Sequence, residues 1–128
     1  MLKTTTILFL IALSVLAALH FIALSLYLYW QVWWFDIPMH LLGGFTVVLG
    51  IHTLADLRIV PRAYATTFLN VFCIILTIAI AWEVFQYAVT EVLKENYMSD
   101  TLSDIAIGLT GAVVGYTFSK RLQASQIQ

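Results

Sequence analysis

The sequence predicts an all-α integral membrane protein, a bundle of four transmembrane helices with both termini in the cytoplasm. Of its 128 residues, 62% are hydrophobic and only 10% are charged, with a formal net charge of −1. Water-soluble domains carry about 25% charged and about 45–50% apolar residues, so this chain has too little polar surface to cover itself in water. Four long apolar runs and an uneven distribution of lysine and arginine complete the prediction. The whole chain, residues 1–128, is expected to form a single membrane domain.

The first apolar run covers residues 4–30 and contains no charged residue. At about 1.5 Å per residue it reaches roughly 40 Å, which is enough to cross a bilayer with some tilt. Lys3 followed by an apolar core is also typical of a secretory signal, but this core is longer than the apolar region of such signals. We therefore expect a retained transmembrane helix.

Three further apolar runs complete the bundle, at residues 38–57, 63–90 and 101–119. A transmembrane helix needs about 20 residues. The last run is the least hydrophobic because it is rich in glycine. Small residues let membrane helices approach closely, so glycines on the second and fourth runs are expected to face a neighbouring helix. These are Gly43, Gly44, Gly108, Gly111 and Gly115.

Basic residues are distributed unevenly between the two sides of this topology. Lys94 falls on one side, whereas the others fall on the opposite side, namely Lys3, Arg58, Arg62, Lys120 and Arg121. Basic residues in short loops favour the cytoplasm, so both termini are predicted to be cytoplasmic in a multi-pass protein of the cell (inner) membrane. Most acidic residues then lie toward the outer half, with Glu91 and Glu95 near Lys94.

The charge balance and the cysteine content exclude several functions. A nearly neutral chain with scattered basic residues lacks the basic surface of a nucleic-acid-binding protein. The single cysteine, Cys73, excludes an intramolecular disulfide and a thiolate metal cluster. The lipid bilayer is the partner that the composition implies.

Ionisable residues inside the predicted spans mark the candidate site. Such groups cost at least about 2.5 to 3.5 kcal/mol at the centre of a membrane helix, so each needs a partner or a function. Asp36 and His40 are four residues apart at the outer start of one helix, and Asp104 shares a helical face with glycines of the last. Glu83 lies about two turns, or roughly 10 Å, below the outer end of its helix. The expected site comprises Asp36, His40, Glu83, Asp100 and Asp104.

Several carboxylates in one small volume need a neutralising partner. Two carboxylates about 4 Å apart repel by roughly 4 kcal/mol at an effective dielectric constant of 20. Protons, a hydrogen-bonded network or a bound cation could offset this repulsion. Oxygen ligands with one imidazole suit Mg²⁺, Mn²⁺, Ca²⁺ or Zn²⁺. All five residues are candidate metal ligands, and Glu83 and Asp104 are the candidate catalytic bases.

Other interpretations of these residues stay open. Three acids could serve only to cap a helix N-terminus or to complement the helix dipole, namely Asp36, Asp100 and Asp104. The cluster as a whole could also be a structural hydrogen-bond network or part of a proton path. Glu83 has no capping role at its depth. His20 is expected to form an interhelical hydrogen bond, and His52 is expected to pair with Asp56 near the cytoplasmic surface.

Three motifs carry a resemblance to a known family. They are residues 36–45, DIPMHLLGGF; residues 82–86, WEVFQ; and residues 100–104, DTLSD, followed by Gly111 and Gly115. Over residues 33–116 the pattern resembles the VanZ-like group of small bacterial membrane proteins and the related YjdF-like proteins. The acidic and histidine positions of that group map onto Asp36, His40, Glu83 and Asp104.

The resemblance implies a multi-span envelope protein, some of whose relatives are linked to glycopeptide antibiotic tolerance, without an established reaction. This sequence departs from the pattern at three places. Ile37 stands where a lysine is common, Gly108 replaces a polar residue, and the arginine expected before the final helix is absent.

Two classes of function compete. In the first, the site binds a divalent cation and binds or acts on an anionic envelope lipid or its headgroup. In the second, the protein is a non-enzymatic accessory, sensing or ligand-binding protein. Its acidic site could then attract a cationic ligand, or its polar cluster could only fix helix packing. The glycine stripes also leave a homo-oligomer open.

Overall fold

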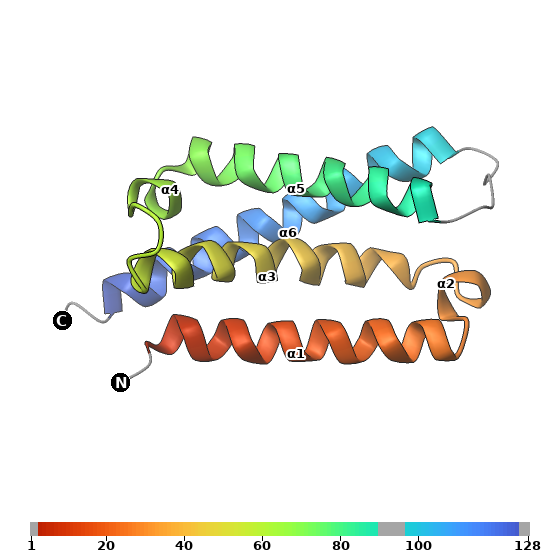
Figure 1. Ribbon diagram of the computed structural model, residues 1–128, viewed down its shortest axis with the longest axis horizontal. Helices are drawn as coiled ribbons and strands as arrows, with labels where there is room; N and C mark the ends of the chain where they lie inside the picture. Colours follow the sequence, from red (N-terminus) through yellow and green to blue (C-terminus); the bar gives the residue numbers. More distant parts are fainter. Residues whose placement is uncertain (1–2, 90–96, 126–128) are drawn as a thin grey trace.

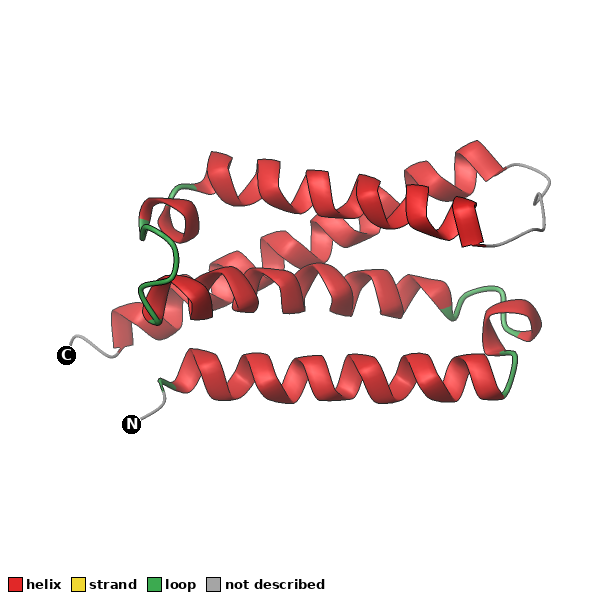
Figure 2. Ribbon diagram, viewed as in Figure 1, coloured by secondary structure: helices red, strands yellow, loops and turns green. Residues whose placement is uncertain are grey.

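The computed structural model describes residues 3–89 and 97–125, and all regular structure within these ranges is helical (Figure 2). Four long helices are α1 (Thr4–Ser25), α3 (Asp36–Asp56), α5 (Phe68–Val89) and α6 (Tyr97–Ser125). Two short helices, α2 (Leu28–Gln31) and α4 (Ala63–Thr66), lie in connections. The 4 long helices are each long and apolar enough to cross a membrane. The all-α membrane bundle is therefore confirmed. Lys94, Glu91 and Glu95 lie outside the described residues.

The helices α1, α3 and α5 lie side by side with α3 in the middle, and α6 crosses behind α3 and α5 (Figure 1). The most extensive packing is between α3 and α6, followed by that between α1 and α3. Both termini lie at the same end of the bundle as α4 (Figure 1). At the opposite end, α3 and α6 begin and α5 ends, so residues from three separate stretches of chain meet there.

Glycine explains the close contact between α3 and α6. A Cβ atom added at Gly44 would collide with the carbonyl group of Gly108, and one added at Gly111 would collide with the backbone of Leu41. A Cβ atom at Gly115 would lie 3.1 Å from the carbonyl oxygen of Phe45. The two backbones are thus in direct contact within one chain, as small residues allow in membrane helices.

Two long helices are several residues shorter than the expected apolar runs, whereas α6 extends beyond its expected run of residues 101–119 at both ends. The first long helix ends at Ser25 rather than at residue 30, because the chain turns at Tyr27, whose φ is 54°. The third begins at Phe68 rather than at residue 63, because Thr67 is extended with ψ of 117°. At this second break the hydroxyl of Tyr116 donates a 2.7 Å hydrogen bond to the carbonyl of Thr66, which satisfies an acceptor that the helix leaves free.

Polar contacts hold the end of the bundle that carries the termini. Asp56 accepts a 2.6 Å hydrogen bond from Lys3 and lies 3.7 Å from Arg62. The expected pairing of His52 with Asp56 was wrong, because His52 points toward α6. Its Nδ1 atom lies 3.0 Å from Nε2 of Gln123, and the side chain is fully buried.

Candidate functional site

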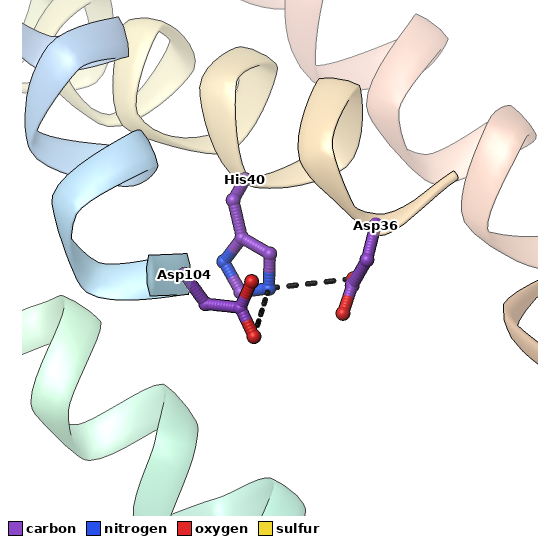
Figure 3. A group of neighbouring side chains, drawn as sticks. All are labelled: Asp36, His40 and Asp104. Carbon is purple, nitrogen blue, oxygen red and sulfur yellow. Dashed lines mark ion pairs between the residues drawn. The ribbon is translucent and has the colours of Figure 1, made fainter. Parts of the chain in front are cut away.

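Four of the five predicted site residues meet where α3 and α6 begin and α5 ends. Asp36 and His40 occupy the first turns of α3, Glu83 lies near the end of α5, and Asp104 lies near the start of α6. Helices that start or end at the same level place these side chains at one depth (Figure 1). Figure 3 shows the side chains of Asp36 and Asp104 pointing toward the imidazole of His40.

The imidazole Nε2 atom of His40 is the centre of the group. It lies 3.3 Å from Oδ1 of Asp36, 3.8 Å from Oδ2 of Asp104 and 4.0 Å from Oε1 of Glu83. One nitrogen atom therefore faces carboxylates from three helices. The donor atoms of Asp36, His40 and Asp104 all lie within 4.8 Å of one another.

The carboxylates are largely removed from solvent, and each of them pairs with His40. Glu83 and Asp104 are each only 6% exposed, whereas Asp36 and His40 are half-buried. Within residues 3–89 and 97–125, no lysine or arginine forms an ion pair with these three carboxylates. A buried carboxylate without a cation is costly, so a group that carries positive charge would stabilise this arrangement.

The geometry fits a small cation. Ligand atoms about 2.1 Å from a metal ion lie about 3.0 to 3.4 Å from one another in tetrahedral or octahedral coordination. The separation of 3.3 Å between His40 and Asp36 already has this value. The oxygens of Asp104 and Glu83, at 3.8 and 4.0 Å from the same nitrogen, need to move by less than about 1 Å.

Asp100, the fifth predicted residue, stands one turn before Asp104 in the first turn of α6. Its charge acts on both Glu83 and Asp104. An acid in the first turn also complements the dipole of the helix. Asp36, Glu83 and Asp104 each form an ion pair with His40, and we place Asp100 beside this cluster.

Two tyrosines near the site were not assigned these contacts from the sequence. The hydroxyl of Tyr97 donates a 3.1 Å hydrogen bond to the backbone carbonyl of Glu83, which ties the start of α6 to α5. The hydroxyl of Tyr29 lies 2.9 Å from Nδ1 of His20. Both residues fall within the predicted first span of residues 4–30, so this local contact does not test the expected bond to another span. Burial and the charge of Asp36 raise the pKa of Tyr29 to about 12, so the phenol keeps its proton at neutral pH.

A cavity of about 350 Å³ adjoins the cluster. Asp36 and His40 line one part of it, together with His20, Tyr29 and Gln86. Apolar residues of α1, α3 and α5 line the remainder. This cavity could not be predicted from the sequence, because its existence depends on the spacing of separate helices.

Comparison with known proteins identifies a family for the chain. Residues 2–125 match a family described as "Predicted membrane protein (DUF2238)". No curated protein and no solved structure matches the chain. The match spans all four long helices, including α1, which the VanZ-like motifs do not cover. The chain belongs to this family of predicted membrane proteins, DUF2238.

Proposed function

We propose that the protein binds one divalent cation between Asp36, His40, Glu83 and Asp104, and that this cation holds the phosphate of an anionic envelope lipid. One observation carries the proposal. Three carboxylates face a single imidazole nitrogen at 3.3, 3.8 and 4.0 Å, with two of them almost fully buried. A cation among these groups would replace their mutual repulsion by attraction.

The donor set restricts the choice of cation. Carboxylate oxygens with one imidazole can bind Mg²⁺, Mn²⁺, Ca²⁺ or Zn²⁺. Mg²⁺ and Ca²⁺ prefer oxygen ligands alone, whereas Zn²⁺ and Mn²⁺ accept an imidazole readily. Zn²⁺ and Mn²⁺ are therefore the first cations to test.

The distribution of basic residues supports a site at the outer face. Lys3, Arg58 and Arg62 lie at the end of the bundle that carries both termini, opposite the cluster (Figure 1). If this basic end is cytoplasmic, the cluster lies just beneath the outer headgroups of the cell membrane. Lipids of the outer leaflet could then reach it by lateral diffusion.

A lipid phosphate would need the cation. No arginine or lysine side chain of the described residues pairs with the cluster, and the starts of α3 and α6 supply only partial positive charge. A bound divalent cation polarises a phosphate oxygen and activates water. If the protein is a hydrolase, Glu83 and Asp104 are the candidate general bases, because they are the two most buried carboxylates of the cluster.

A non-enzymatic role in packing is the second candidate. The bond from Tyr97 to the carbonyl of Glu83 and the backbone contact between Gly44 and Gly108 lie beside the cluster. Both show that this end of the bundle is held by contacts unrelated to a ligand. In this case the cluster fixes the ends of α3, α5 and α6, and the VanZ-like resemblance describes a shared scaffold.

Metal analysis of purified protein tests the proposal. Protein prepared without chelator is expected to contain about one equivalent of metal, measured by elemental mass spectrometry, and to bind Zn²⁺ or Mn²⁺ in calorimetric titrations after chelator treatment. Loss of an outer-shell partner weakens metal sites by about 10- to 100-fold, so His40→Ala and Asp104→Asn should each weaken binding by at least that factor.

Asp56→Asn is the matched control, because it removes a carboxylate at the opposite end of the bundle. It should leave metal binding unchanged. Wild-type protein that binds neither cation, or variants that all bind like wild type, would favour the packing role.

A further inference from the structure

We propose that the cavity between α1, α3 and α5 binds one hydrocarbon chain of a phospholipid from the surrounding bilayer, with the headgroup of that lipid at Asp36 and His40. The inference deepens the proposed function, on which it rests for the headgroup. It adds a binding site for the tail, which the cation cluster does not supply.

The shape of the cavity suits an extended chain. Its lining residues run along α3 from Asp36 to Val47 and along α5 from Ile75 to Gln86. Each of these stretches spans about 16 Å at 1.5 Å per residue. The cavity therefore follows the helix axes from the polar cluster toward the middle of the membrane.

The size and chemistry of the cavity argue against water as the occupant. Its volume of about 350 Å³ lies in the range of ligand pockets. One water molecule takes up only about 30 Å³, and the apolar part of the cavity, away from Asp36 and His40, has no polar side chains to hold water by hydrogen bonds. The deep part is lined by side chains such as Leu16, Val47, Ile75 and Ala79.

Small residues create the space. Gly43 lines the cavity, and a Cβ atom added there would meet no atom within 4 Å. Its neighbour Gly44 has the opposite surroundings, because a Cβ atom there would collide with the backbone of α6. Ala17 on α1 and Ala79 on α5 leave further room between the helices. Gly44 and Gly108 also line the cavity, so the gap borders the packed α3–α6 interface.

The cavity is accessible from the bilayer. Several of its lining residues are partly exposed on the outside of the bundle, with Leu13 at 42%, Ile78 at 43% and Trp82 at 41%. These residues come from α1 and α5, which flank α3 on either side (Figure 1). A hydrocarbon chain can therefore enter sideways from the membrane.

The polar residues lie at one part of the cavity, as an amphiphile requires. Asp36 and His40 belong to the cation cluster, and the hydrogen-bonded pair of His20 and Tyr29 lies on α1 and α2 nearby. A lipid with its phosphate at the cluster would place its chain against the apolar walls. The reverse orientation would place the charged headgroup against apolar side chains, where it would lack hydrogen-bond partners.

A pair of alanine variants tests the inference. Ala79 lines the cavity, whereas Ala81 is exposed on the same helix and does not. Protein purified from the membrane and washed in detergent is examined by native mass spectrometry, with phosphatidylglycerol added back as the probe. Wild type and Ala81→Leu should each retain one phospholipid per chain. Ala79→Leu and Gly43→Leu should retain at least tenfold less at equal lipid concentration, while circular dichroism shows an unchanged helix content.

The opposite results overturn the inference. Equal retention in Ala79→Leu and Ala81→Leu would place the lipid on the outer surface, and a wild-type chain that retains none would leave the cavity without a phospholipid. Crosslinks between two copies of the chain from a photoreactive residue at Ile78 would show that a second copy covers the cavity.

Metal content measured on the same samples separates the two proposals. Ala79→Leu should lose lipid and keep its metal. Metal-free protein that retains phospholipid in an Ala79-dependent manner would refute the cation site and leave the tail site standing.

Discussion

Nε2 of His40 lies 3.3 Å from Oδ1 of Asp36, one turn earlier on α3, and the same nitrogen faces carboxylates from α5 and α6. A contact within one helix turn is thereby part of a cluster that joins three helices. The cluster can bind one cation only if its carboxylates coordinate it jointly. Replacing each carboxylate in turn therefore tests whether that residue is a ligand.

Glu83→Gln tests whether the deepest carboxylate belongs to the cation site. The substitution keeps the shape of the side chain and removes its charge. If Glu83 is a ligand, the affinity for Zn²⁺ or Mn²⁺ should fall by at least about 10- to 100-fold in calorimetric titrations. A variant with wild-type affinity and stoichiometry would contradict the assignment, and Asp56→Asn again serves as control.

Gly111→Leu tests the contact between α3 and α6. A side chain at this position collides with the backbone of Leu41, which cannot move away as a flexible side chain can. Overpacking costs about 1 to 3 kcal/mol in ordinary cores, and a backbone collision should cost at least the upper value. The melting temperature in detergent, followed by circular dichroism, should fall strongly. Ala81→Leu is the control, because Ala81 is exposed on α5 and does not line the cavity, and it should melt like wild type.

Gln123→Ala tests the buried contact of His52. The variant leaves Nδ1 of a fully buried imidazole without its 3.0 Å partner. An unsatisfied buried polar group costs about 1 to 3 kcal/mol, so thermal stability should decrease. Metal affinity should stay unchanged, because this contact lies at the end of α3 opposite the cluster. A simultaneous loss of metal binding would show that the two ends are coupled.

The titration of Tyr29 reports on the charge of Asp36. The pKa of Tyr29 is raised to about 12, mainly because the phenol is buried and secondly because of the charge of Asp36. Among the 6 tyrosines of the chain, one should therefore ionise near pH 12 in ultraviolet absorbance, and this step should be missing in Tyr29→Phe. A cation bound at Asp36 should shift the step to lower pH, because it offsets the carboxylate charge. An unchanged step at saturating Zn²⁺ would argue against a cation beside Asp36.

The same shift makes stability depend on pH in a defined direction. The pKa of Tyr29 is raised in the folded protein, so its contribution is fully present below the ordinary value of about 10 and is lost as the pH rises through about 12. Between pH values of about 10 and about 12, the wild-type protein should therefore lose more stability than Tyr29→Phe. Melting temperatures measured from pH 9 to pH 12 check this difference, and parallel curves would contradict it.

The sequence by itself determined the number of membrane helices and the residues that need a polar partner. The number of helices and the identity of these residues follow from the free energy of placing an apolar segment or a single charge in hydrocarbon. That free energy depends on local composition. Glu83 shows this most clearly, because a carboxylate two turns inside an apolar helix has to face other polar groups. The sequence also indicated that the glycines of the second and fourth spans face a neighbouring helix, since glycine permits contact between backbones.

Only the tertiary structure decided which neighbour each residue meets. Gly43 and Gly44 are adjacent in sequence, yet about 100° of helical rotation turns one toward a cavity and the other toward the backbone of α6. The tertiary structure also decides the contact of Tyr116 beside the break at Thr67, the bond of His52 to Gln123 and the cavity itself. Each of these involves residues that are far apart in the chain. Their physical basis is the relative position of whole helices, which the hydropathy of each single segment does not contain.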